Sequence, residues 1–351
     1  MKRAYLVLED GTVFEGFALG KEAEAVGECV FTVGGMCGYL ETLSDPAYCG
    51  QIMVQTFPLI GNYGFIESDL EGECTLAGYV VRECCDEPSN FRCEGDLDSF
   101  LKVKGIPAIM GVDTRALTVH LRENGCMNAK ICSSDHVDLQ EIKDFKIHGA
   151  VESVGCKEIS VSPAEGEELY RITAIDCGTK RSFIKQLTKC GATVTVMPAV
   201  SSFSEVLATN PQGIFVSSGP GDPKDCVALD LVKALFGHFP MLGIGLGHQL
   251  MALAAGGDTY KMKHGHRGGS QPVKQLEDGF CYITTQNHGF EVKTEGLKGV
   301  VTMVNLNDGG VEAVDYPLQR SLSVQFYPEV SGAPRDGSFV YESFFKKIRG
   351  V

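Results

Sequence analysis

The sequence predicts an α/β protein in two unlike parts, a β-rich α+β domain followed by a domain built on a mostly parallel sheet. Short strand-like runs fill the first half of the chain, whereas strand-like and helix-like runs alternate in the second. A polar stretch with proline and glycine, residues 161–168, separates the two patterns, as a linker would. We therefore expect domains at residues 1–150 and 171–351, with a linker at 151–170.

The first domain begins with a hairpin signal. Two apolar runs, Tyr5–Leu8 and Val13–Ala18, flank Asp10 and Gly11, and this dipeptide is typical of tight turns between antiparallel strands. Further strand-like runs follow at residues 28–33 and 78–82. This half of the chain is therefore predicted to be rich in β-structure.

The second domain shows repeated strand–helix–strand units. Strands are predicted at residues 172–175, 193–197, 213–216 and 241–244, with helices at 180–189 and 227–236. Such units form parallel sheets with right-handed crossovers, and their functional loops lie at the carboxyl ends of the strands. The last part of the chain predicts additional antiparallel strands at residues 281–285, 299–304 and 320–324. A final helix is predicted at residues 338–348.

Composition and charge exclude several classes of protein. The 351 residues are 44% hydrophobic, enough for two cores, and the formal charge of −14 opposes binding to nucleic acid. No stretch approaches the roughly 20 apolar residues of a membrane span. The first residues lack the apolar core of a signal peptide. We expect a cytoplasmic protein without a nucleic-acid or membrane partner.

Metal and nucleotide sites are not expected. The 14 cysteines are scattered without a Cys-x-x-Cys pair, which favours reduced thiols, and the spacing of Cys84, Cys85 and Cys93 fits no common zinc pattern. The pair His264 and His266 lies beside cationic side chains that would repel a metal ion. The glycine-rich run at 217–223 lacks the Gly-Lys-Ser/Thr of a phosphate-binding loop. No cofactor is predicted.

A sharp strand-to-helix turn is predicted at Gly245. The buried strand 241–244 precedes it, and residues 248–255 have helical composition. Turns of this kind present one reactive side chain above a sheet and place the next backbone N–H where it stabilises an oxyanion. Here the apex residue has no side chain.

The segment Gly243–Gln249 resembles the active-site signature of class I glutamine amidotransferases, with glycine where that family has cysteine. Other segments resemble, in order, the small subunit of carbamoyl phosphate synthetase: residues 38–48, 60–62, 90–92, 113–118, 218–223, 264–269 and 286–290. The resemblance implies a flavodoxin-like second domain. It also implies a large, ATP-using partner subunit that receives ammonia from glutamine, in arginine or pyrimidine biosynthesis.

The resemblance places three catalytic positions in this chain. Gly245 stands at the nucleophile, Tyr327 at the histidine that serves as base, and Glu329 at the carboxylate that orients it. A phenol, with an ordinary pKa of about 10, is a poor base at neutral pH. Two of the three positions therefore have the wrong chemistry.

The implied glutamine pocket is partly retained. The resemblance implies oxyanion donors at Gly219 and Leu246, and contacts to the amino-acid part of glutamine at Gly221, Gln249, Asn287, Gly289 and Phe290. Ala47 stands where the family has a serine that touches the substrate, so one contact is lost.

We therefore expect a glutaminase-inactive small subunit that acts as a structural or regulatory partner of the large subunit. One alternative is an active hydrolase with an unrecognised nucleophile. Cys177 and Cys226, near predicted strand ends or loops of the same domain, are expected to be buried or incidental. A second alternative is a sensor that binds L-glutamine through Gln249 and Asn287 without cleaving it.

Overall fold

The computed structural model describes residues 1–328 and 337–350. The chain divides into two compact units, Met1–His148 and Gly149–Val351. Each contains its own hydrophobic cores.

The first unit is a closed seven-stranded barrel with the strand order β1-β2-β8-β6-β4-β3-β9. Its strands are β1 (Arg3–Leu8), β2 (Val13–Gly20), β3 (Ala25–Thr32), β4 (Gln51–Gln55), β6 (Gly78–Val80), β8 (Pro107–Met110) and β9 (Met127–Cys132). The predicted hairpin is β1 and β2, with Val7 opposite Val13. The β-rich character predicted for this half is confirmed.

Alternate residues of the barrel strands face two different cores. Ile52 and Val54 of β4 belong to one, whereas Met53 belongs to the other. The helices α1 (Tyr39–Ser44) and α2 (Leu97–Lys104) pack in the core of Met53. Helix α3 (Thr114–Asn124) packs in the other. Smaller elements complete the unit: β5 (Leu59–Ile60), β7 (Glu83–Cys84), α4 (Leu139–Asp144) and the 3-10 helices η1 (Pro46–Tyr48) and η2 (Glu67–Asp69).

The second unit contains a ten-stranded sheet of order β10-β12-β11-β13-β14-β19-β18-β17-β15-β16. Five neighbouring strands run parallel: β12 (Ala192–Pro198), β11 (Tyr170–Asp176), β13 (Gly213–Val216), β14 (Met241–Ile244) and β19 (Ser321–Val324). Antiparallel strands flank them: β10 (Ser160–Ser162), β18 (Val311–Tyr316), β17 (Val300–Asn305), β15 (Asp258–Gln275) and β16 (Cys281–Lys293). The predicted α/β fold, with a parallel sheet extended by antiparallel strands, is confirmed.

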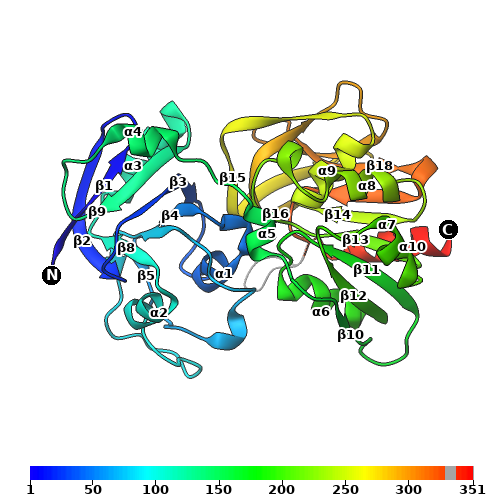
Figure 1. Cartoon of the computed structure of the whole chain (residues 1–351), viewed down its shortest axis with the longest axis horizontal. Helices are drawn as coiled ribbons and strands as arrows, with labels where there is room; N and C mark the ends of the chain where they lie inside the picture. Colours follow the sequence, from blue (N-terminus) through cyan, green and yellow to red (C-terminus); the bar gives the residue numbers. More distant parts are fainter. Residues whose placement is uncertain (329–336, 351) are drawn as a thin grey trace. The chain divides into compact units, whose positions relative to one another are not determined.

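Helices cover both faces of this sheet, as Figure 1 shows. Helices α6 (Arg181–Lys189) and α10 (Phe339–Arg349) pack in one core. Helices α7 (Phe203–Ala208), α8 (Leu229–Leu235) and α9 (Leu246–Ala254) pack in the other. Successive residues of β13, Ile214 and Phe215, face opposite cores, as strand geometry requires. Short 3-10 helices are η3 (Pro223–Asp225) and η4 (Pro317–Gln319).

Residues 151–170, expected as a linker, contribute to the second unit. They include most of α5 (Ala150–Val154), and Val151 is buried in one of the unit's cores. Strand β10 pairs antiparallel with β12, with Ser160 opposite Val196. The polar composition of β10 reflects its place at the sheet edge.

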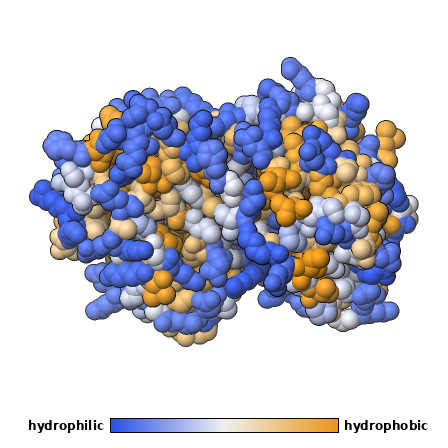
Figure 2. All heavy atoms as spheres, in the orientation of Figure 1, coloured by the Kyte–Doolittle hydropathy of each residue, from blue (hydrophilic) through white to orange (hydrophobic). Residues whose placement is uncertain are grey.

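The described residues form no helix long and apolar enough to cross a membrane. On the face drawn in Figure 2, hydrophobic residues form separate patches among hydrophilic ones. All 14 cysteines lie in the described residues, and none of them forms a disulfide.

Candidate active site

The strand-to-helix turn forms at the carboxyl end of β14. Gly245 links β14 to α9 with φ 59° and ψ −113°, a conformation that side chains strongly disfavour. Its N–H donates to the carbonyl of Val324 (3.0 Å), and its own carbonyl accepts from the N–H of Gln249 (3.3 Å). The turn is therefore held by the neighbouring strand and by the first turn of α9.

Gly245 and Tyr327 are neighbours. A Cβ atom at Gly245 would lie 3.1 Å from Cβ of Ser218 and 3.6 Å from Cε1 of Tyr327. A side chain at the apex would thus extend between these two residues. The structure brings together the expected nucleophile and base positions, but it places neither a thiol nor an imidazole there. Glu329, the expected carboxylate, lies outside the described residues.

A buried lysine lies beside Tyr327. The Nζ atom of Lys180 is 4.8 Å from the centre of the Tyr327 ring, and the exposed fractions are 2% for Lys180 and 4% for Tyr327. Phe183 packs against the same ring edge to face, with ring centres 5.5 Å apart. Lys180 directly follows the loop after β11, and its cationic group over an aromatic face is a favourable arrangement. Sequence reasoning missed this contact, although Lys180 lies just beyond the carboxyl end of a parallel strand.

The glycine-rich loop after β13 packs tightly against β11. A Cβ atom at Gly219 would lie 2.2 Å from the carbonyl oxygen of Cys177, so no side chain fits there. The N–H of Gly247 donates to the carbonyl of Ser217 (3.0 Å) and links the loop to α9. Leu246 opens α9, where the first N–H groups have no partner within the helix. The loop and the helix start therefore retain the backbone expected of an oxyanion site.

The expected glutamine-contacting residues of α9 and β16 meet in the structure. The side-chain amide of Gln249 donates to the carbonyl of Phe290 (2.9 Å) and to Oε1 of Gln325 (3.0 Å). Asn287 lies opposite Arg267 in the β15–β16 pairing, and both are buried. Gly221 has φ +91° and open space where a Cβ atom would lie. Ala47 belongs to the first unit, where it is buried in η1.

Comparison with known proteins decides the family. Residues 6–131 match the carbamoyl-phosphate synthase small chain, CPSase domain, and residues 173–347 match the class I glutamine amidotransferases. The carbamoyl phosphate synthase small chain of Caldanaerobacter subterraneus is 45% identical over 97% of this chain and 95% of its own. That of Bacillus cereus is 43% identical over 99% and 96%. The chain belongs to the carbamoyl phosphate synthase small-chain family.

Cys177 and Cys226, expected to be buried or incidental, form a buried pair in this small chain. A hydrogen bond to Cys226, together with burial, holds the pKa of the Cys177 thiol well above its usual range. The same hydrogen bond lowers the pKa of Cys226. Cys177 is fully buried and Cys226 is 9% exposed. Because the thiolate is the nucleophile, a protonated and buried Cys177 is unsuited to the role.

His248 lies within the protein core beneath the turn. It is fully buried, and its Nδ1 lies 2.8 Å from Oγ of Ser323 on β19. Burial lowers its pKa to about 3. The side chain is therefore a neutral, hydrogen-bonded part of the core. It does not replace the histidine expected beside Gly245.

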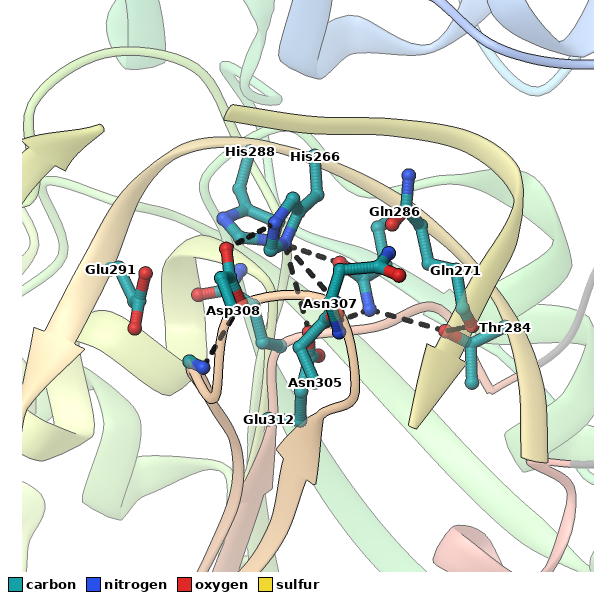
Figure 3. Close-up of polar contacts among 12 residues, drawn as sticks. His266, Gln271, Thr284, Gln286, His288, Glu291, Asn305, Asn307, Asp308 and Glu312 are labelled. Atoms are coloured by element: carbon teal, nitrogen blue, oxygen red, sulfur yellow. Dashed lines mark hydrogen bonds and ion pairs between the residues drawn. The ribbon is translucent and has the colours of Figure 1, made fainter. Parts of the chain in front are cut away.

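A buried polar cluster lies on one face of β15 and β16, as Figure 3 shows. His266 and His288 lie directly opposite each other in the strand pairing, with ring centres 5.0 Å apart. Glu312 of β18 accepts hydrogen bonds from Gln286 (2.8 Å) and Asn305 (2.9 Å). Burial raises the pKa of Glu312 to about 8 and lowers that of His288 well below its usual value. Sequence reasoning considered His266 only together with His264, and it missed Glu312, which lies more than 20 residues away from His266 and His288.

Proposed function

We propose that this small chain does not hydrolyse glutamine and acts as a structural or regulatory partner of a large subunit. That subunit would make carbamoyl phosphate from bicarbonate, ATP and ammonia in the cytoplasm, for arginine or pyrimidine synthesis. The observation that supports this role is the pair of neighbouring positions 245 and 327, which hold glycine and tyrosine.

The reaction requires groups that are missing from both positions. Hydrolysis converts glutamine and water into glutamate and ammonia. In the cysteine mechanism a thiolate attacks the carboxamide carbon, and an imidazolium then gives its proton to the departing ammonia. Gly245 offers no nucleophile, and the ordinary phenol pKa of about 10 makes Tyr327 a poor proton acceptor at neutral pH. In serine-type triads the loss of the nucleophile alone lowers the rate by about 10⁶-fold.

The backbone groups that would stabilise an oxyanion are retained, but they cannot support hydrolysis when no nucleophile attacks glutamine. Gly219 and Leu246 still border the turn, and a tight contact to Cys177 fixes Gly219. An oxyanion site contributes by binding charge that develops during the reaction. Without attack no such charge develops, so in the proposed role these backbone segments serve the fold and the packing of α9.

Glutamine sensing is a second candidate, supported by the contact between Gln249 and Phe290. A sensor would bind glutamine at the pocket without cleaving it. Ala47 argues against this role, because it lacks the hydroxyl expected there, and the side-chain amide of Gln249 already donates to two oxygens. Calorimetric titration of the chain with glutamine distinguishes the two roles: saturable heat supports sensing, and its absence supports the structural role.

The experiment that tests the proposed role uses the complex with the large subunit from the same source. Carbamoyl phosphate formation is measured with ammonia and, separately, with glutamine. We expect an ammonia-dependent rate that changes when the small chain is added, and no rate with glutamine. The variant Gly245→Cys, Tyr327→His and Ala47→Ser, which restores the groups that the family resemblance implies, should gain a glutamine-dependent rate. A glutamine-dependent rate in the unaltered complex would contradict the proposal.

A further inference from the structure

The buried polar cluster on β15, β16 and β18 has an arrangement that the proposed function does not use. His266, His288 and Glu312 are 5%, 7% and 1% exposed. Arg267 and Asn287, the next residues on each strand, pair opposite each other, so they lie on the other face of the ribbon. The guanidinium of Arg267 donates to the carbonyl of His264 (2.7 Å). Asn287 thus lies on the face opposite the cluster, whereas the backbone carbonyl of Phe290, another residue expected to contact glutamine, accepts a hydrogen bond from His288.

The hydrogen bonds of His288 determine which ring nitrogen holds the proton. Its Nδ1 lies 2.9 Å from the carbonyl oxygen of Phe290, so Nδ1 must be the donor. A neutral ring that donates through Nδ1 has a lone pair on Nε2. That atom lies 3.0 Å from Oε1 of Gln286, whose amide nitrogen donates to Glu312 and Thr284. Two lone pairs therefore face each other, as they do around a cation.

His266, like His288, donates its N–H away from Glu312. Its Nε2 lies 2.8 Å from Oδ2 of Asp308, so the ring donates outward to a carboxylate. This leaves the Nδ1 lone pair directed inward, 3.8 Å from Oε1 of Glu312 and 3.4 Å from the side-chain amide nitrogen of Asn305, which donates to it. A histidine that binds a metal through one nitrogen commonly donates its other N–H to a carboxylate or a backbone carbonyl. Asp308 and the carbonyl of Phe290 supply these two acceptors, as Figure 3 shows for Asp308.

Glu312 supplies the third converging group. Two amides, from Gln286 and Asn305, donate to its Oε1. Its Oε2 is buried and has no hydrogen-bond partner among the described residues. One ligand atom from each of His266, His288 and Glu312 lies within 4.8 Å of the others. An unpaired buried carboxylate oxygen beside two imidazole lone pairs is costly without a counter-charge.

We propose that His266, His288 and Glu312 bind a divalent metal ion, with Zn²⁺ the best match. Two imidazole nitrogens and one carboxylate are a donor set that zinc uses in proteins, with a fourth position left for water or another oxygen. The ion would join β15, β16 and β18. Asp308, 41% exposed at its side chain, lies between the cluster and solvent and offers an entry route. This site differs from the His264 and His266 pair considered from the sequence, because His264 does not take part.

A proton offers the competing explanation. If Glu312 carried a proton and the oxygen and nitrogen of the Gln286 side-chain amide were exchanged, the Gln286 nitrogen would donate to Nε2 of His288. The carboxyl group of Glu312 would then be neutral, and no metal would be needed. The two explanations differ in whether the protein binds metal stoichiometrically, and the proposal is independent of any loss of glutaminase activity.

The test uses the full chain after removal of metal with a chelator. Zinc chloride and cobalt chloride are titrated into it, and bound metal is counted after dialysis. Cobalt also identifies the ligands, because thiolate ligation gives intense near-ultraviolet charge-transfer bands that nitrogen and oxygen ligands do not give. This distinction matters in a protein with 14 cysteines. We expect one equivalent of cobalt, bound without thiolate bands.

Variants locate the site. Glu312→Gln and His266→Gln should each weaken binding at least tenfold, whereas His264→Gln, the matched control, should leave it unchanged. Asp308→Asn keeps an oxygen that can accept from the N–H of Gly310 and removes the carboxylate that accepts from His266. It should weaken binding by about 10- to 100-fold. Circular dichroism of each metal-free variant verifies folding. Failure of the unaltered chain to bind one equivalent, or binding by the Glu312→Gln and His266→Gln variants as tight as that of the unaltered chain, would overturn the proposal.

Discussion

The ammonium group of Lys180 lies 4.8 Å from the centre of the Tyr327 ring, and both residues are buried. Tyr327 stands at the position where the family resemblance implies the catalytic histidine. A nearby ammonium disfavours a second positive charge, so a proton acceptor at this position would lose basicity. The aromatic ring instead gains from the cation, a contact that favours the buried position of Tyr327.

The contact between Lys180 and Tyr327 should stabilise the fold. A double-mutant cycle with Lys180→Met and Tyr327→Leu is expected to give a coupling energy of about 1 to 2 kcal/mol in favour of the native pair. Urea denaturation measures the four free energies of unfolding. Tyr327→Phe keeps the ring and serves as the control, with a smaller loss than Tyr327→Leu. Additive effects of the two substitutions would show that the contact contributes nothing.

Replacement of Gly245 should destabilise the second unit. Gly245→Ala forces a side chain into φ 59° and places its Cβ 3.1 Å from Cβ of Ser218. We expect a loss of about 1 to 3 kcal/mol in the free energy of unfolding. Gly221→Ala is the matched control, because Gly221 has φ +91° and open space around its Cβ position, and should lose less. Gly245→Cys should also lower the melting temperature. An equal or higher melting temperature for either Gly245 variant would contradict the account.

Glu312 should make the metal-free protein less stable as pH rises. Its pKa is raised from 4.5 to about 8 in the folded state, so the folded protein holds a proton that the unfolded chain releases. The stability linked to this proton is fully present below pH 4.5 and is lost as pH rises towards 8. Melting curves of the unaltered chain and Glu312→Gln across this window give the comparison. The variant's melting temperature should decline less, and parallel declines would argue against a buried acid.

His248 should give the opposite dependence. Burial lowers its pKa from 6.5 to about 3, so the folded state excludes a proton that the unfolded chain binds. The stability linked to the neutral ring is present above pH 6.5 and is lost as pH falls towards 3. His248→Gln keeps a polar group near Ser323 and should be less sensitive to acid over this range. A variant as acid-sensitive as the unaltered chain would contradict this assignment.

The sequence revealed local features well because they depend on neighbouring residues. The alternation of strands and helices predicted β11, α6, β12 and β14, and a short apolar run before a glycine predicted the turn at Gly245. The long strand β15 was missed because its centre, residues 263–271, is rich in charge and glycine and lacks apolar alternation. Its partner β16 holds it in place over many residues.

The missed functional features depend on contacts between distant parts of the chain. Glu312 reaches His266 only because β18, β17, β15 and β16 are neighbours in the sheet. Lys180 meets Tyr327 because the parallel strands β11 and β19 lie in the same sheet although many residues separate them. The pattern of a single sequence does not show which distant strands become neighbours in a sheet, or which of their residues lie opposite each other. The motif at Gly243–Gln249 was identified because all its residues lie in one turn.

Release of glutamate is the most direct measure of whether this small chain hydrolyses glutamine. Isotopically labelled glutamine is incubated with the complex of this chain and its large subunit, with ATP and bicarbonate present, and labelled glutamate is quantified against a reaction without protein. The account predicts release at background, unchanged by Cys177→Ser or Cys226→Ser. Release well above background that either cysteine substitution abolished would show a working glutaminase with a different nucleophile and would contradict the account.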